Sequence, residues 1–166
     1  MTLGLVFGGA DTGHVLRRVS QTYWPQNVNN VNQSVPVPGG ITLGSMVHLR
    51  GIYVNYTGFY VDFRQNDDST KVNFHFRPRL NYDTKMPVIA LSYCNNGVWG
   101  SETRPNISVY PFVVNQVFEV HILVRGDAFL VYINRVFFYS YPHVMPPEKI
   151  NWIRVIGVVN VTELSV

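Results

Sequence analysis

Alternation of apolar and polar residues with a period of two recurs between Ser45 and Leu164, and this pattern constrains the fold most. Successive side chains of a β-strand point to opposite faces, so each alternating segment predicts a strand with one buried face. No window carries the sustained i, i+3, i+4, i+7 apolar stripe of an amphipathic helix. Short strands separated by turn signals predict an all-β fold, a two-sheet antiparallel sandwich.

Turn signals divide this part of the chain into nine segments that we predict to be strands. Asn66-Asp67-Asp68-Ser69 and Asn95-Asn96-Gly97 are two such signals, because Asn, Asp and Gly tolerate the backbone conformations of tight turns. The predicted strands cover residues 45–54, 58–64, 71–79, 88–93, 118–125, 129–134, 136–141, 152–155 and 158–164.

The start of the chain differs from this pattern. Residues 27–33 are rich in Asn and are predicted to be a loop, whereas residues 3–7 and 15–19 each carry a weak strand pattern. We therefore divide the chain into an N-terminal extension, residues 1–35, and a main domain, residues 36–166. The extension is expected to be an extra strand, a tail or a dimer contact.

Composition excludes several classes of protein. A hydrophobic content of 46% with only 14% charged residues is not that of a disordered chain. The net charge is +3 and there is no run of Lys or Arg, so nucleic-acid binding is not expected. No stretch of 18 apolar residues is present, so membrane insertion is not expected. Cys94 is the one cysteine, which excludes an internal disulfide, and we expect it to be a small strand residue rather than a reactive thiol.

The stretch from Lys71 to Arg79 predicts a strand with an unusually polar outer face. Val72, Phe74 and Phe76 are expected to point into the core. The residues between and beyond them are expected to share the opposite face: Asn73, His75, Arg77 and Arg79.

Residues 99–104 add an aromatic ring, a bend and a carboxylate to this picture. Trp99 comes just before the bend at Gly100, and Glu102 and Arg104 share one face of the segment that follows. The apolar face of a pyranose can stack on an aromatic ring, while its hydroxyls need directional donors and acceptors. The two segments together therefore predict a sugar-binding surface.

The order of elements and these residues resemble the galectins, β-sandwich lectins that bind β-galactosides without metal. The resemblance runs from about Val35 to the C-terminus. The family motif reads His-x-Asn-Pro-Arg, then an Asn on the next strand, then Trp-Gly-x-Glu-x-Arg. Its matches here are His75, Arg79, Trp99, Glu102 and Arg104. The resemblance implies a jelly-roll sandwich in which His75 and Arg79 hold the axial O4 of galactose, Trp99 stacks on the sugar and Arg104 orients Glu102.

Two positions depart from the family motif. Arg77 stands where the family has the Asn of the first motif, and Ser92 stands where it has the second Asn. Arg only donates hydrogen bonds, and Ser reaches less far than Asn, so we expect altered affinity or specificity for galactosides. The expected carbohydrate-binding residues are His75, Arg77, Arg79, Ser92, Trp99, Glu102 and Arg104. Tyr60, Asp62 and Arg64 are expected to extend the groove for a longer glycan.

The leading function is therefore a lectin that recognises β-galactoside sugars on a concave sheet face. The alternative is a galectin-fold interaction module that has lost galactoside binding. A glycosidase needs two carboxylates across the scissile bond, and only Asp62 is a candidate partner for Glu102, so we do not expect an enzyme.

No cofactor and no metal are expected, because His14, His48, His121 and His143 lack the sequence spacing of metal ligands. The expected partners are galactose-containing glycans or glycoproteins, with homodimerisation left open. The apolar start of the chain lacks a basic leading region and is read as mature protein rather than a signal peptide. By resemblance, the protein is expected in the cytoplasm, outside the cell by non-classical export, or in both places.

Overall fold

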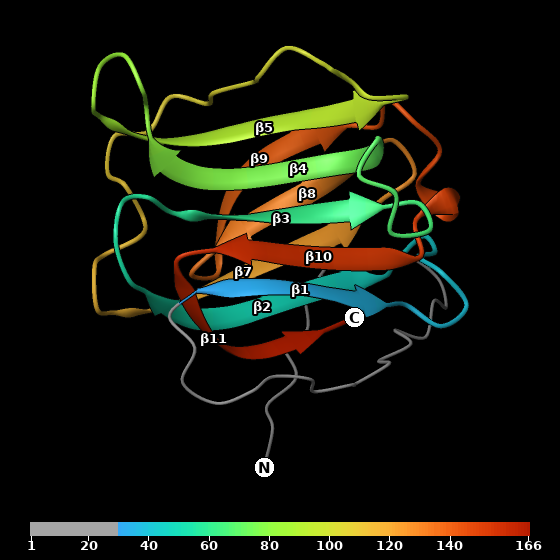
Figure 1. Ribbon diagram of the computed structural model, residues 1–166, viewed down its shortest axis with the longest axis horizontal. Coiled ribbons are helices and arrows are strands. Elements are labelled where there is room, and N and C mark those ends of the chain that lie inside the picture. Colours follow the sequence, from blue (N-terminus) through green and yellow to red (C-terminus); the bar gives the residue numbers. More distant parts are fainter. Residues whose placement is uncertain (1–29) are drawn as a thin grey trace.

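Strands form where the sequence alternates, and they pair into two antiparallel sheets that stack face to face (Figure 1). The computed structural model describes residues 30–166. The six-stranded sheet has the order β1-β10-β3-β4-β5-β6. Its strands are β1 (Val31–Pro36), β10 (Trp152–Gly157), β3 (Phe59–Arg64), β4 (Lys71–Leu80), β5 (Pro87–Asn95) and β6 (Val98–Trp99).

The five-stranded sheet has the order β11-β2-β7-β8-β9. Its strands are β11 (Val159–Ser165), β2 (Met46–Tyr53), β7 (Val117–Val124), β8 (Ala128–Ile133) and β9 (Val136–Pro142). A single 3-10 turn, η1 (Pro147–Lys149), precedes β10 and is the one helical element among residues 30–166. No helix in this part of the chain is long and apolar enough to span a membrane.

This architecture confirms the predicted all-β antiparallel sandwich, and the predicted strands form within a few residues of their expected bounds. The prediction of a loop over residues 27–33 is wrong for its last part, because residues 31–33 begin β1, which pairs with β10. Val31 and Val35 are buried there, and their burial outweighs the low strand propensity of the Asn residues beside them. The expected strands at residues 3–7 and 15–19 lie outside the described residues.

Phenylalanine rings join the two sheets. Phe59 on β3 stacks on Phe118 on β7, with ring centroids 5.2 Å apart, and Phe74 on β4 stacks on Phe129 on β8 at 4.8 Å. All four side chains are at most 2% exposed. Large apolar rings that interdigitate between sheets contribute both buried area and specific ring contacts. Because β3 and β4 are anchored from behind in this way, their outward side chains are held in fixed positions.

A β-bulge in β4 changes which residues face the core. Arg64 pairs with Val72 and Phe63 with Phe74, which leaves Asn73 as the extra residue of the bulged strand. Val72 therefore lies on the outer side of the sheet with Arg64 and is buried outside the main core cluster. The expectation that Val72 points inward and Asn73 shares the face of His75 is wrong for this reason.

The bulged Asn73 is fully buried, and its amide makes two hydrogen bonds. Nδ2 donates to the carbonyl of Pro146 at 2.9 Å, and Oδ1 accepts from Gln65 at 2.8 Å. Both polar groups of the amide are thus satisfied, as burial requires. Asn73 therefore ties the start of β4 to the segment that leads into η1 and is not available to a ligand.

Phe59→Ala should lower the free energy of unfolding by about 3–5 kcal/mol, because it removes a buried ring and leaves a cavity between the sheets. The matched control is Phe137→Ala on the edge strand β9, where the ring is 54% exposed. The control should cost less than about 1 kcal/mol. Urea denaturation followed by circular dichroism measures both values, and equal losses in the two variants would contradict this description of the core.

Candidate functional site

Strands β3, β4 and β5 lie side by side in the six-stranded sheet (Figure 1), and β6 follows β5 at its edge. The outward side chains of these four strands share one face of the sheet. His75 on β4 lies opposite Asp62 on β3 and Ser92 on β5. Trp99 lies opposite Cys94, two residues beyond Ser92, and so shares this face. We call this surface the polar face and define it by Tyr60, Asp62, Arg64, His75, Arg77, Arg79, Ser92, Trp99, Glu102 and Arg104.

A buried carboxylate holds the histidine of the polar face. Asp62 Oδ1 lies 2.6 Å from His75 Nδ1, and Asp62 Oδ2 accepts hydrogen bonds from Arg64 Nε at 3.1 Å and Nη2 at 2.8 Å. All three side chains are at least nine-tenths buried. Since an ionised carboxylate only accepts hydrogen bonds, Nδ1 carries the proton, and Nε2 of the neutral ring is left as an acceptor.

A second ion-pair network centres on Glu102, in the segment after β6. Arg79 Nη2 donates to both Glu102 oxygens, at 2.9 and 3.0 Å, and Arg104 donates to Oε2 from Nε at 2.8 Å and Nη2 at 2.6 Å. Burial acts to raise the pKa of Glu102, but hydrogen bonds and charge from Arg104 and Arg79 outweigh it and lower that pKa. Glu102 is therefore an ionised acceptor at neutral pH.

Small residues on β5 let this network form across the strand. Leu91 on β5 pairs with Thr103, which places the segment of Glu102 beside β5, while Arg79 is on β4 at its other side. Ala90 and Ser92, the outward residues of β5 at this point, are short and fully covered. A longer side chain at position 90 would stand between Glu102 and Arg79, because the diagonal contact between them passes over this residue.

Gly100 fixes the bend that follows Trp99. A Cβ atom at this position would lie 2.2 Å from Cε1 of Tyr93, so only glycine allows the backbone to pass over that ring. Ser92 Oγ donates a hydrogen bond to the Gly100 carbonyl at 2.9 Å and holds the bend from the other side. Ser92, the residue at the second family Asn position, thus positions the backbone next to Trp99.

Two aromatic rings flank His75. Trp99 meets it edge to face, with centroids 4.9 Å apart and planes at 70°, and Tyr60 lies 5.1 Å away on the β3 side. Trp99 is 51% exposed although its neighbours on β5 are buried. The indole therefore presents a rigid apolar surface to solvent beside the buried histidine.

Tyr82 is a residue of this surface that the sequence reasoning missed. It lies in the loop between β4 and β5, and its ring covers the Arg79 guanidinium at 4.4 Å. Its hydroxyl accepts a hydrogen bond from Arg77 Nη2 at 2.8 Å. The sequence signal that could have identified Tyr82 is an aromatic residue three positions after Arg79, at the start of a tight loop. Tyr82 is 61% exposed, so it forms a second aromatic border of the polar face.

Arg77 is held away from the centre of the polar face. Besides its hydrogen bond to Tyr82, its guanidinium lies 5.8 Å from the Tyr60 ring and 5.9 Å from the Tyr82 ring. These cation–π contacts tend to fix the guanidinium between the two tyrosines. Arg77 therefore lies as a charged bridge between two aromatic rings.

All ten residues expected at the site lie on the polar face, but they are not equally accessible. Asp62, Arg64 and Arg79 are all at most 5% exposed. Asp62 is hydrogen-bonded to both His75 and Arg64, so Asp62 and Arg64 support His75 and do not line an open groove. Arg64 also forms an ion pair with Asp67, with Nη1 3.5 Å from Oδ1. The same Asp67 oxygen lies 3.7 Å from Nη1 of Arg154 on β10. Cys94 is buried beneath Trp99, and burial raises the pKa of its thiol, in keeping with a strand residue of low reactivity.

Comparison with known proteins identifies a family for most of the chain. Residues 32–166 match the family model described as galactoside-binding lectin. The chain is 29% identical over 144 residues to galectin-3 of Canis lupus familiaris, covering 85% of this chain and 46% of that protein. It is 31% identical over 124 residues to galectin-4 of Homo sapiens, covering 74% of this chain and 37% of that protein. The chain thus spans less than half the length of these two curated relatives.

Solved structures agree on the fold. A doubly substituted variant of human galectin-16 superposes with a TM-score of 0.69 at 23% identity, over 80% of this chain and 91% of that one. Sheep galectin-11, solved in complex with glycerol, superposes with a TM-score of 0.67 at 20% identity, over 85% of this chain and all of that one. At this identity the likeness concerns the fold alone.

Asp62→Ala should lower the free energy of unfolding by about 3–5 kcal/mol, because it leaves the buried Arg64 charge with only its longer contact to Asp67. The control is Asp83→Ala in the exposed loop between β4 and β5, which should change stability by no more than about 0.5 kcal/mol. Thermal and urea unfolding measure both. A variant at position 62 as stable as the parent would mean that Asp62 does not hold this network.

Proposed function

The chain belongs to the galactoside-binding lectin family, and on this premise we propose that it binds β-galactoside glycans, without metal, through the polar face. The observation that carries the proposal is the half-exposed indole of Trp99, set edge to face against His75 and next to the Arg79–Glu102–Arg104 network. This places a stacking surface beside fixed donors and acceptors. A sugar needs both, because one side of its ring is apolar and its edge is polar.

Each residue has a distinct role in the proposed complex. Trp99 stacks on the apolar side of galactose. His75 Nε2 and the Arg79 guanidinium offer an acceptor and a donor to one hydroxyl, which suits a group that does both. Glu102 accepts from a neighbouring hydroxyl, held in position by two arginines that also keep it ionised. Arg79 Nε is buried without a hydrogen-bond partner in the described part of the protein, so this guanidinium retains an unused donor.

The same contacts argue for binding and against hydrolysis. A glycosidase needs one carboxyl group with a raised pKa as its general acid and a second across the scissile bond. The pKa of Glu102 is lowered, and Asp62 is buried and hydrogen-bonded to both His75 and Arg64. Neither carboxylate suits the acid role, so we propose a binding protein that is not an enzyme. Hydrolysis of a chromogenic galactoside checks this point directly.

The proposed partners are glycans or glycoproteins that carry galactose. We propose that these are met in the cytoplasm, outside the cell after non-classical export, or in both places. Homodimerisation would cross-link such partners, and sedimentation of the protein with and without lactose tests it. If a glycan array shows no binding, the result would support the alternative, an interaction module that has lost sugar binding.

Trp99→Ala and Glu102→Ala should each lower the affinity for a bound galactoside by about 1–3 kcal/mol, since one removes the stacking surface and the other the acceptor. Val98→Ala is the matched control, because Val98 is 71% exposed, adjoins Trp99 and points to the opposite face. Isothermal titration calorimetry with the best array ligand measures the three affinities. Unchanged binding in both site variants would place the sugar site elsewhere.

Lactose should bind the native protein weakly, with a dissociation constant on the order of 1 mM or worse, which corresponds to about 4 kcal/mol. Arg77 is engaged by two tyrosines, and the Ser92 hydroxyl is engaged by Gly100, so neither replaces the amide that the family has there. The double change Arg77→Asn with Ser92→Asn should tighten binding about tenfold, or roughly 1.4 kcal/mol. Tight native binding, or no gain in the double variant, would show that these two positions do not govern affinity.

A further inference from the structure

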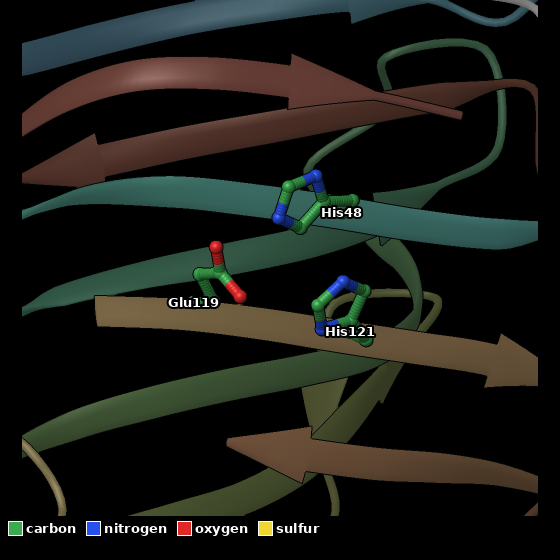
Figure 2. Close-up of side chains that lie close together, drawn as sticks. All are labelled: His48, Glu119 and His121. Atoms are coloured by element: carbon green, nitrogen blue, oxygen red, sulfur yellow. The ribbon is translucent and has the colours of Figure 1, made fainter. Parts of the chain in front are cut away.

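The five-stranded sheet carries a group of metal-ligating side chains on its outer face, opposite the polar face. His48 on β2 and His121 on β7 are direct cross-strand partners, and Glu119 lies two residues before His121 on the same face. One ligand atom from each of the three residues lies within 4.8 Å of the other two. Figure 2 shows the two imidazole rings on neighbouring strands with the carboxylate beside them.

His48 is oriented as a metal ligand commonly is. Its Nδ1 lies 3.5 Å from Glu163 Oε1 on the neighbouring strand β11. Its Nε2 is buried and has no hydrogen-bond partner in the described part of the chain. A carboxylate that faces one ring nitrogen fixes the tautomer and leaves the lone pair of the other nitrogen for a metal, a pattern typical of zinc-binding histidines.

The His121 ring stacks flat against the His48 ring. The ring centroids are 4.3 Å apart and the planes differ by only 8°. Burial, together with the neighbouring His48, lowers the pKa of His121. Two stacked imidazolium ions would repel each other, whereas two neutral imidazoles each offer a lone pair.

Two arginines near Glu119 compete with a metal ion for its carboxylate. Glu119 Oε1 lies 3.6 Å from Arg50 Nε, and Oε2 lies 3.3 Å from Arg135 Nε. These guanidinium groups are 44% and 63% exposed, so both are surface ion pairs of small energy. A divalent ion, with twice the charge, would displace them from the carboxylate at low cost.

We propose that His48, His121 and Glu119 bind a divalent transition-metal ion, Zn²⁺ being the representative case, and that Glu163 orients His48. Zinc–nitrogen bonds are about 2.0–2.1 Å long, so bound ligand atoms lie roughly 3–4 Å apart. From separations of up to 4.8 Å, the ligand atoms therefore need to close by up to roughly 1–2 Å, and the stacked imidazole rings need to rotate so that their lone pairs converge on the ion. Imidazole ligands select Zn²⁺ or Cu²⁺, whereas Mg²⁺ and Ca²⁺ prefer oxygen alone.

Spacing along the chain does not reveal this group of side chains. His48 and His121 are 73 positions apart in sequence, yet the antiparallel pairing of β2 and β7 makes them neighbours. The site lies on the opposite sheet from Trp99 and has no part in the proposed sugar contacts. Zn²⁺ should therefore leave lactose binding unchanged, and either proposal can fail without the other.

The test is calorimetric titration of Zn²⁺ into tag-free protein and its variants. Glu163→Gln should weaken binding about tenfold, as the loss of an orienting group does. His48→Gln, His121→Gln and Glu119→Gln should each weaken it by more than that. Arg135→Gln should tighten it about two- to threefold by releasing the carboxylate. The controls His143→Gln and Glu148→Gln should bind as the parent does.

Two further measurements guard against variants that lose their fold. Circular dichroism checks each variant, and NMR of the native protein follows the imidazole signals directly during the titration. The signals of His48 and His121 should move on addition of Zn²⁺, while those of His75 and His143 should not. No Zn²⁺ binding by the parent below about 1 mM, or equal affinity in all folded variants, would overturn the proposal.

Discussion

The packing of β4 against the opposite sheet is the constraint on which the rest of the structure depends. Phe74 and Phe76 are buried between the sheets, and Phe74 stacks on Phe129 of β8. A strand held by its inner residues cannot slip without turning its whole inner face outward. The outer residues His75 and Arg79 are therefore fixed by hydrophobic packing on the other side of the same strand. Their hydrogen-bond networks refine positions that the core has already set.

His75 and Glu102 are each held by a charged neighbour that itself stays buried. Asp62 holds His75, and Arg79 holds Glu102 from β4 while Arg104 holds it from its own segment. Such preorganisation lowers the entropy lost when a ligand binds, which matters most for a small sugar with few contacts. Arg77 is the exception, because its two tyrosine contacts fix it in a place that the family's shorter amide would not occupy.

Much of the fold and of the site could be predicted from the sequence, because both follow from a period of two. Alternation located the strands, placed His75, Arg77 and Arg79 on one face of their strand, and placed Glu102 and Arg104 on one face of a later segment. The resemblance to the galectins joined these two sets into one site. Alternation failed where the period breaks, since the extra residue of the β4 bulge moved Val72 and Asn73 to unexpected sides. Contacts that depend on tertiary pairing were also out of reach. No local sequence pattern shows that Tyr82 of the β4–β5 loop packs over Arg79. Nor does one show that β2 pairs with β7.

The central claim is that the outer face of β3 to β6 binds a galactoside, and an NMR titration of the native protein with lactose tests it most directly. Amide and indole signals report each region separately, even when binding is weak. The account predicts progressive shifts of the Trp99 indole and of residues 75–79 and 99–104, with strands β2 and β7 unaffected. Shifts confined to the five-stranded sheet, or none at tens of millimolar lactose, about ten times the expected dissociation constant, would contradict it.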